Sequence, residues 1–547
     1  MFPVWILAVL SQTCYGSPTK RDIVSEVTVK LDDAMVTGVS NATTLVDSFL
    51  GIPFGKPPVG NLRFSLPQAV DAYTGAVNAT TYGPACPQQL AKVPTLPDVP
   101  GLEYVQAVFD AATSSSLADD EDCLSINVLR PSGVNDTSNL PVVAWIYGGG
   151  FQEGSTAATD GSGIVSRSIQ LGEPVIYVSM NYRVSAFGFL AGQEVKDAGV
   201  GNLGLHDQRL ALKWIQKYIL SFGGDPNKVT IWGESAGAIS VSLHMVMKDG
   251  DNEGLFRAAF MNSGSPGSMS DITAGQADYD TLVDKTGCSS EADTLACLRA
   301  VDYDTLKAAV DESPFIFDYQ ALSLPWRPRV DGVLFSDEPQ TLVTAGKVSA
   351  VPIVNGDCDD EGTLFSFSQL NVTTDDEFRT YVGEIYFKDK ASDKDLDAVM
   401  ESYPSELTAG SPFDTGDKNA LTPQFKRLAA FQGDAVFQAP RRFFLRALEG
   451  NSNSDIWTFA HKTMKSTPYL GAFHSSDLLD AYGGGPLAEY VIHFVNNLDP
   501  NGGNSPAWPR WTSAGAQMLA FSDTGVTVIK DTYRQEAMEK INAIMAK

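Results

Sequence analysis

The residues best suited to chemistry are 233–237, which read Gly-Glu-Ser-Ala-Gly. The apolar, β-branched residues 228–232 before them predict a buried strand, and residues 238–245 after them predict a helix. A serine at the turn between a strand and a helix can project its hydroxyl as a nucleophile. The flanking glycines carry no Cβ, so strand and helix can approach this turn closely. We therefore predict that Ser235 is a nucleophile and that Glu234 has a structural role.

A second glycine-rich run, residues 148–150, follows the strand predicted over residues 142–147. Consecutive glycines let backbone N–H groups face a substrate with no side chain in between. Together with the N–H of Ala236, which follows the serine, this run is predicted to bind an oxyanion. A phosphate-binding loop is excluded, because neither Lys-Ser nor Lys-Thr follows the glycines and no helix begins there.

A serine nucleophile needs a histidine base, and the chain has five histidines. The expected order along the chain is serine, acid, histidine, and catalytic groups concentrate in loops. His474 lies in a predicted loop after a strand and is chosen as the base. The other histidines precede the serine or lie within predicted strands and helices, and we assign them structural roles: His206, His244, His461 and His493.

The acid that orients this histidine is expected between residues 235 and 474. A predicted strand over residues 351–356 ends in a group of carboxylates, and the residues alone leave three candidates, Asp359, Asp360 and Glu361. Cysteine and histidine residues do not occur at metal-ligand spacing, so we expect no metal and no cofactor.

These residues need a scaffold, and apolar strand-like segments alternate with helical ones along the chain. This alternation predicts an α/β fold with a large, mostly parallel central sheet and helices on both faces. No linker divides residues 17–547, which we expect to form one catalytic domain. Residues 87–122 are predicted to be a lid insertion, with Leu102, Val105 and Phe109 as the apolar stripe of one helix. The alternative is an ordinary surface helix packed on the core.

Charge and the amino terminus bear on location and partners. The net charge of −27 disfavours nucleic acids and anionic membrane surfaces as partners. Residues 1–16 read as a secretory signal peptide, with a short apolar core, and further processing after Lys20-Arg21 is an open possibility. We therefore expect an extracellular protein, with four N-glycosylation sequons at Asn41, Asn78, Asn135 and Asn371.

Motifs along nearly the whole mature chain resemble the type-B carboxylesterase/lipase family of α/β-hydrolases, within it the large secreted fungal lipase and sterol esterase branch. The motifs lie at residues 51–64, 121–128, 148–151, 181–183, 202–208, 223–226, 233–237, 360–363, 473–475 and 508–511. The resemblance implies an α/β-hydrolase fold with Glu361 as the acid and Gly149, Gly150 and Ala236 as oxyanion donors. It also implies a lid clipped by a disulfide, with the pairings Cys86–Cys123 and Cys288–Cys297 and a free Cys358.

The expected function is hydrolysis of long-chain fatty acid esters, as in a lipase or sterol esterase, through an acyl-enzyme. The apolar lid favours a hydrophobic ester as substrate, with a lipid–water interface as its setting, and an exposed stripe on an open lid could support a homodimer. One alternative is a carboxylesterase for short, soluble esters. Another is a non-catalytic binding or adhesion homologue, because relatives of this family have lost the catalytic residues.

Overall fold

One large sheet organises the protein. The computed structural model describes residues 24–113, 118–451 and 454–547. In these residues thirteen strands form a sheet in the order β1-β2-β3-β5-β7-β6-β8-β9-β10-β11-β12-β13, with β4 paired to β2. The strands are β1 (Val24–Leu31), β2 (Asp33–Asn41), β3 (Val46–Pro53), β4 (Thr74–Asn78), β5 (Ser125–Pro131), β6 (Leu140–Ile146), β7 (Ile176–Met180), β8 (Gly224–Glu234), β9 (Ala258–Asn262), β10 (Ile353–Cys358), β11 (Ile456–Lys462), β12 (Gln517–Ser522) and β13 (Gly525–Lys530).

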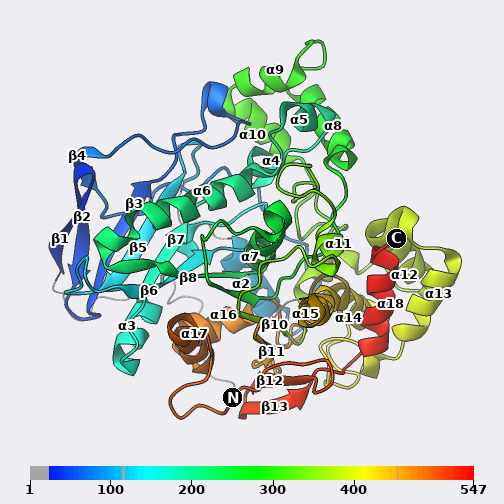
Figure 1. The fold of residues 1–547 in the computed structure, drawn as a ribbon. Helices are drawn as coiled ribbons and strands as arrows, with labels where there is room; N and C mark the ends of the chain where they lie inside the picture. The colour runs from blue at the N-terminus through cyan, green and yellow to red at the C-terminus, as the bar shows by residue number, and fades with distance from the viewer. Residues whose placement is uncertain (1–23, 114–117, 452–453) are drawn as a thin grey trace.

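Helices follow most of the strands and surround the sheet (Figure 1). They are α2 (Leu102–Thr113), α3 (Ser162–Leu171), α4 (Ser185–Phe189), α5 (Gln193–Ala198), α6 (Leu203–Tyr218), α7 (Ala236–Val246), α8 (Gln276–Lys285), α9 (Thr294–Ala300), α10 (Tyr303–Asp311), α11 (Pro339–Thr344), α12 (Asp375–Tyr381), α13 (Asp393–Ser402), α14 (Phe425–Gly433), α15 (Ala439–Asn451), α16 (Ser476–Tyr482), α17 (Pro486–Asn497) and α18 (Gln535–Met545).

The central strands of the sheet are parallel, as predicted, and its edges are antiparallel. Strands β7-β6-β8-β9-β10-β11-β12 run in one direction. Strands β1, β2, β3 and β5 at one edge and β13 at the other pair antiparallel with their neighbours along this order, whereas β4 pairs parallel with β2. Every residue of β5 is buried, although its sequence includes the polar residues Ser125, Asn127 and Arg130.

Both faces of the sheet are covered by helices. In β6, Val142 and Ala144 belong to a core shared with α6 and α7, whereas Val143 and Trp145 belong to a second core shared with α3 and α17. Side chains alternate between the faces of a strand, so each strand contributes to both cores. Figure 1 shows α6 and α17 on opposite sides of the strands. The carboxyl ends of the parallel strands lie along the same side of the sheet. In open α/β sheets, ligands bind at this side.

The amphipathic helix predicted in the insertion is α2, and its role as a lid stays a prediction. Leu102, Val105 and Phe109 are buried, together with Val108. They pack in a cluster with phenylalanines from distant segments, namely Phe315, Phe317, Phe365, Phe367, Phe425, Phe437 and Phe473. The helix therefore closes over an apolar surface in this structure.

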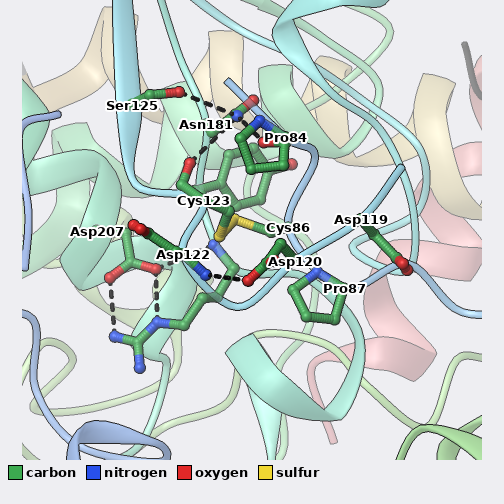
Figure 2. Close-up of a disulfide and its surroundings, with 12 residues drawn as sticks. Pro84, Cys86, Pro87, Asp119, Asp120, Asp122, Cys123, Ser125, Asn181 and Asp207 are labelled. Carbon is green, nitrogen blue, oxygen red and sulfur yellow. Dashed lines mark hydrogen bonds and ion pairs between the residues drawn. A yellow bond between two sulfur atoms is a disulfide. The ribbon is translucent and has the colours of Figure 1, made fainter. Parts of the chain in front are cut away.

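A disulfide joins the two ends of this insertion. Cys86 bonds to Cys123, and Figure 2 shows this bridge with Pro87 and Asp119, which belong to the two ends. Asn181 donates from Nδ2 to the carbonyl of Cys123 at 3.2 Å, which fastens one end to the residue after β7. The bridge and this bond keep the ends together while leaving α2 at the far end of the loop.

The structure also places the remaining residues singled out in the sequence. Cys288 bonds to Cys297, and Cys358 is a buried free thiol. Asn78, Asn135 and Asn371 are exposed and Asn41 is half-buried, so their glycosylation stays a prediction. The predicted signal peptide and Lys20-Arg21 lie outside the described residues. Within the part of the chain that is described, no helix combines the length and apolarity needed to span a membrane.

Candidate active site

Ser235 lies at a sharp turn between β8 and α7. Its φ of 55° and ψ of −126° fall in a region that non-glycine residues rarely adopt. A Cβ on Gly237 would lie 2.0 Å from the carbonyl oxygen of Ile146, so only glycine fits beside the neighbouring strand β6. The sequence Gly-Glu-Ser-Ala-Gly therefore holds Ser235 in strain, at the carboxyl end of a central parallel strand.

Three predicted residues form one hydrogen-bonded series. Ser235 Oγ lies 2.8 Å from His474 Nε2, and His474 Nδ1 lies 2.5 Å from Glu361 Oε2. Their exposed fractions are 7%, 4% and 1%, so the series is shielded from water. Glu361 follows β10 and His474 follows β11, and these strands are neighbours in the parallel part of the sheet.

Glu361 is held in place by two donors that the sequence analysis did not identify. The hydroxyl of Ser263 and the backbone N–H of Cys358 both donate to its Oε1 at 2.6 Å. The other carboxylate oxygen, Oε2, therefore faces His474. Ser263 follows β9. Its φ of 56° is positive, which indicates a strained backbone at this residue, and this strain cannot be recognised from the sequence.

The two alternative acids face elsewhere. Lys465 Nζ donates to Asp359 Oδ2 at 2.7 Å and to Asp360 Oδ2 at 2.6 Å. Asp360 also accepts hydrogen bonds from the backbone N–H groups of Phe413 and Ala472. These two aspartates therefore tie together the loops around the site and do not contact the histidine in the series.

The glycine-rich loop lies against the serine. A Cβ on Gly148 would lie 2.9 Å from the Cβ of Ser235. Gly149 and Gly150 have φ values of 101° and 61°, which favour glycine. The predicted third donor, Ala236, is the first residue of α7 and is buried. The glycine-rich loop and the amino terminus of α7 therefore both lie next to Ser235.

A second carboxylate, Glu234, faces the histidine. Its Oε1 lies 3.3 Å from His474 Nε2 and accepts a hydrogen bond from the Ser475 hydroxyl. Burial lowers the pKa of His474, but the Glu361 and Glu234 carboxylates outweigh it and raise that pKa to about 9. Burial raises the pKa of Glu234 to about 7, against the attraction of His474. The two carboxylates therefore stabilise the charged form of His474.

The other four histidines lie in secondary structure and not in this series. His206 belongs to α6, and His461 lies in β11. His244, in α7, bonds to Gln208 through Nε2, and His493, in α17, bonds to Glu173 through Nδ1. Among the described residues, no group of three or more His, Cys, Asp or Glu could hold a metal ion.

Aromatic side chains form an apolar wall beside the histidine. The ring centroids of Phe437 and Phe365 lie 4.5 Å and 5.3 Å from that of His474. Phe365 stacks on Phe317, which in turn contacts Phe109 of the lid helix. A continuous row of rings thus connects α2 with the site.

This arrangement is suited to acyl transfer. A strained hydroxyl contacts a buried imidazole, a carboxylate orients that imidazole, and backbone donors lie beside them. Such groups together support nucleophilic attack on a carbonyl and stabilisation of the resulting oxyanion.

Comparisons with known proteins agree with this chemistry. The model of the carboxylesterase family matches residues 25–540. Lipase 2 of Diutina rugosa is 43% identical, covering 90% of this chain and 91% of its own. Secreted triacylglycerol lipase LIP1 of Gibberella zeae is 40% identical, covering 96% and 92%. The crystal structure of Aspergillus niger EstA superposes with a TM-score of 0.80 at 28% identity, covering 95% of this chain and 99% of that one.

The fold and the family match define the protein as an α/β-hydrolase that cleaves carboxylic esters. The chain belongs to the carboxylesterase family, and fungal lipases are among its relatives.

Proposed function

We propose that the protein is a serine hydrolase for esters of long-chain fatty acids, a lipase or sterol esterase, with Ser235, His474 and Glu361 as its catalytic residues. The observation that carries the proposal is the buried series from Ser235 Oγ to Glu361 Oε2, beside a glycine loop and beneath an apolar lid. The lipases among the relatives support the same substrate class.

In the proposed reaction the hydroxyl of Ser235 attacks the ester carbonyl while His474 Nε2 takes its proton. Glu361 accepts a hydrogen bond from Nδ1, which fixes the imidazole and stabilises its charged form. The N–H groups of Gly149, Gly150 and Ala236 bind the oxyanion. His474 then returns the proton to the leaving alcohol, and water repeats the sequence on the acyl-enzyme to release the fatty acid. No cofactor takes part in these steps.

The lid gives this chemistry its substrate class. Phe109 is fully buried and its ring centroid lies 4.9 Å from that of Phe317. Moving α2 away from the cluster would expose the row of rings that ends at His474. We propose that the insertion 87–122 opens as a lid, that a lipid–water interface or a second copy of the chain covers the exposed surface, and that the rings bind the acyl chain.

The proposed setting is extracellular. The predicted signal peptide, two disulfides and similarity to secreted fungal lipases support this location.

The catalytic assignment is tested by Ser235→Ala. We expect kcat/KM for p-nitrophenyl butyrate to fall about 10⁴-fold or more, with the thermal unfolding temperature unchanged. The control is Ser242→Ala, since Ser242 lies in the same helix as Ala236 and its hydroxyl donates to the backbone carbonyl of Ile239. Near-complete activity in the Ser235 variant would refute the assignment.

The substrate class is tested separately, with the wild-type protein. We expect hydrolysis of emulsified triolein or cholesteryl oleate to exceed that of a butyrate ester. A strong preference for the short ester would contradict the long-chain proposal and leave the catalytic residues unaffected.

A further inference from the structure

Two adjacent glutamines at the start of the lid insertion contact the loop that carries the oxyanion glycines. The carboxamide of Gln88 accepts a hydrogen bond from the N–H of Gly154 at 2.5 Å, through Oε1. Its Nε2 donates to the carbonyl of Gly154 at 3.1 Å and to that of Cys86 at 2.5 Å. One side chain thus pairs with both backbone groups of Gly154, as a neighbouring strand would.

The second glutamine makes a similar connection two residues earlier in the loop. The N–H of Gln89 donates to the carbonyl of Gln152 at 2.9 Å. The Nε2 of Gln152 donates to Gln89 Oε1 at 2.8 Å and to the carbonyl of Pro314 at 2.8 Å. Gln89 Nε2 donates to the carbonyls of Ser313 and Pro314, at 2.7 Å and 3.2 Å. Gln89 is 2% exposed and Gln152 is 0% exposed, so water cannot replace these bonds.

The loop transmits these contacts to the oxyanion glycines. The carbonyl of Gly149 accepts hydrogen bonds from the N–H groups of Gln152 and Glu153, at 3.0 Å and 3.1 Å. Residues 149–153 therefore form one tight turn. Gln89 and Gln152 both bind the segment that contains Ser313 and Pro314, and this segment continues to Ile316. Ile316 packs against Gly150 so closely that a Cβ on Gly150 would lie 2.7 Å from its Cδ1. A displacement of Gln152 would thus move Gly149, and a displacement of Pro314 would release the contact over Gly150.

The carboxyl-terminal end of the lid insertion also contacts one of these glutamines. The N–H of Gln88 donates to Asp119 Oδ2 at 3.0 Å, and Ala85 forms an isolated parallel bridge with Asp119. The Cys86–Cys123 disulfide lies beside them (Figure 2). Both ends of the insertion are therefore fixed where the insertion meets the oxyanion loop.

We propose that Gln88, Gln89 and Gln152 are positioning residues that hold the oxyanion loop at the distance from Ser235 that the reaction requires. The lid then bends beyond Gln89, because movement of the glutamines themselves would displace the loop. This inference rests on the proposed catalytic role of Ser235 and of the oxyanion N–H groups. Backbone donors stabilise the transition state only when they are placed within a few tenths of an ångström, and they contribute little to ground-state binding.

The test uses Gln152→Met and Gln89→Met, which keep the length of the side chain and remove its hydrogen bonds. We expect kcat for p-nitrophenyl butyrate to fall about tenfold or more, with KM within about twofold of the wild-type value. A trifluoromethyl ketone forms a tetrahedral adduct whose oxygen occupies the oxyanion site. Its inhibition constant is expected to weaken by the same factor as kcat/KM, a relation that loss of folded protein would not produce.

The direct bond between the two side chains makes a second prediction. Because each single variant already breaks the Gln89–Gln152 bond, the double variant is expected to lose less than the product of the two single losses. Gln216→Met is the matched control. Gln216 Nε2 also donates to two carbonyls, those of Pro226 and Leu255, and Pro226 lies at the opposite end of β8 from Ser235.

Unchanged kcat and inhibition constants in both single variants would overturn the proposal, as would equal losses in the Gln216 control. Gln88→Met provides the same readouts if a buried variant fails to fold, because Gln88 is half-buried. Ser235→Ala separates the two levels of inference. An active Ser235 variant refutes the proposed function, whereas an inactive Ser235 variant alongside unaffected glutamine variants refutes only the positioning role.

Discussion

Replacing Glu234 by glutamine removes a charge beside the catalytic histidine and leaves the shape of the site intact. Glu234 Oε1 lies 3.3 Å from His474 Nε2 and accepts a hydrogen bond from Ser475, which a glutamine oxygen can also accept. A Cβ on Gly148 would lie 2.7 Å from Glu234 Oε2, so the carboxylate packs against the glycine-rich loop. The variant therefore tests electrostatics with little change in packing.

The size of the effect follows from the pKa of His474. That pKa is raised from 6.5 to about 9 by the Glu361 and Glu234 carboxylates against the opposing effect of burial. Glu361 makes the larger contribution, since it also accepts a hydrogen bond from Nδ1. Loss of Glu234 is expected to lower the pKa of His474 by about one unit, which corresponds to about 1.4 kcal/mol.

The effect on catalysis depends on pH. Well below pH 9 the imidazole is charged both in the free enzyme and in the transition state. Glu234 then stabilises both states equally, so its removal is expected to leave kcat/KM unchanged. Above pH 9 only the transition state carries the charge, so kcat/KM is expected to fall about tenfold for each pKa unit lost. The acid limb of the pH profile is expected to move down by the same unit.

The assay is kcat/KM for p-nitrophenyl butyrate from pH 6 to pH 10, corrected for spontaneous hydrolysis. Glu173→Gln is the control, because Glu173 pairs with His493 at 2.9 Å away from the site and its loss is expected to leave the profile unchanged. A loss that is equal at every pH would show that Glu234 acts through geometry. An unmoved acid limb would refute the electrostatic reasoning.

Three further outcomes are expected. Burial raises the pKa of Glu153 to about 8 from 4.5, so its protonated form stabilises the fold fully below about pH 4.5, and this stabilisation is lost as pH rises through 8. Glu153→Gln is therefore expected to raise the Tm at pH 9 and not at pH 4 in thermal scans, and an equal gain at both pH values would contradict this cause. Phe109→Ala is expected to weaken the closed lid by about 3 kcal/mol and to increase turnover of a soluble ester without an interface, whereas a lasting decrease would argue against a lid. Replacing Cys86 and Cys123 together by serine is expected to lower the free energy of unfolding by about 3–4 kcal/mol in denaturant titrations, given a separation of 37 residues, and no loss would indicate that the loop is ordered without the bridge.

Local patterns in the sequence were sufficient for the parts of the site that depend on neighbouring residues. The turn at Ser235 needs a strand, two glycines and a helix in succession, and all lie within a short stretch. The lid helix was visible because Leu102, Val105 and Phe109 repeat with helical spacing, and all three are buried.

Other parts depend on contacts that no local pattern encodes. Asp359, Asp360 and Glu361 are consecutive, and only the three-dimensional path of the chain decides which of them faces His474. Ser263 lies 98 residues from the carboxylate that it holds, so the sequence carries no signal of that bond. The antiparallel direction of β5 also depends on distant segments, because β5 pairs with β3 and β7 and its own seven residues do not encode the direction of those partners.

The wide separation of the catalytic groups along the chain has a consequence for biogenesis. Ser235 and His474, the proposed nucleophile and base, are 239 residues apart, and they meet only after β8, β9, β10 and β11 have aligned. A nascent polypeptide in which His474 does not yet lie beside Ser235 is therefore expected to have no hydrolytic activity. Appearance of turnover during refolding is therefore expected to mark completion of the sheet interior.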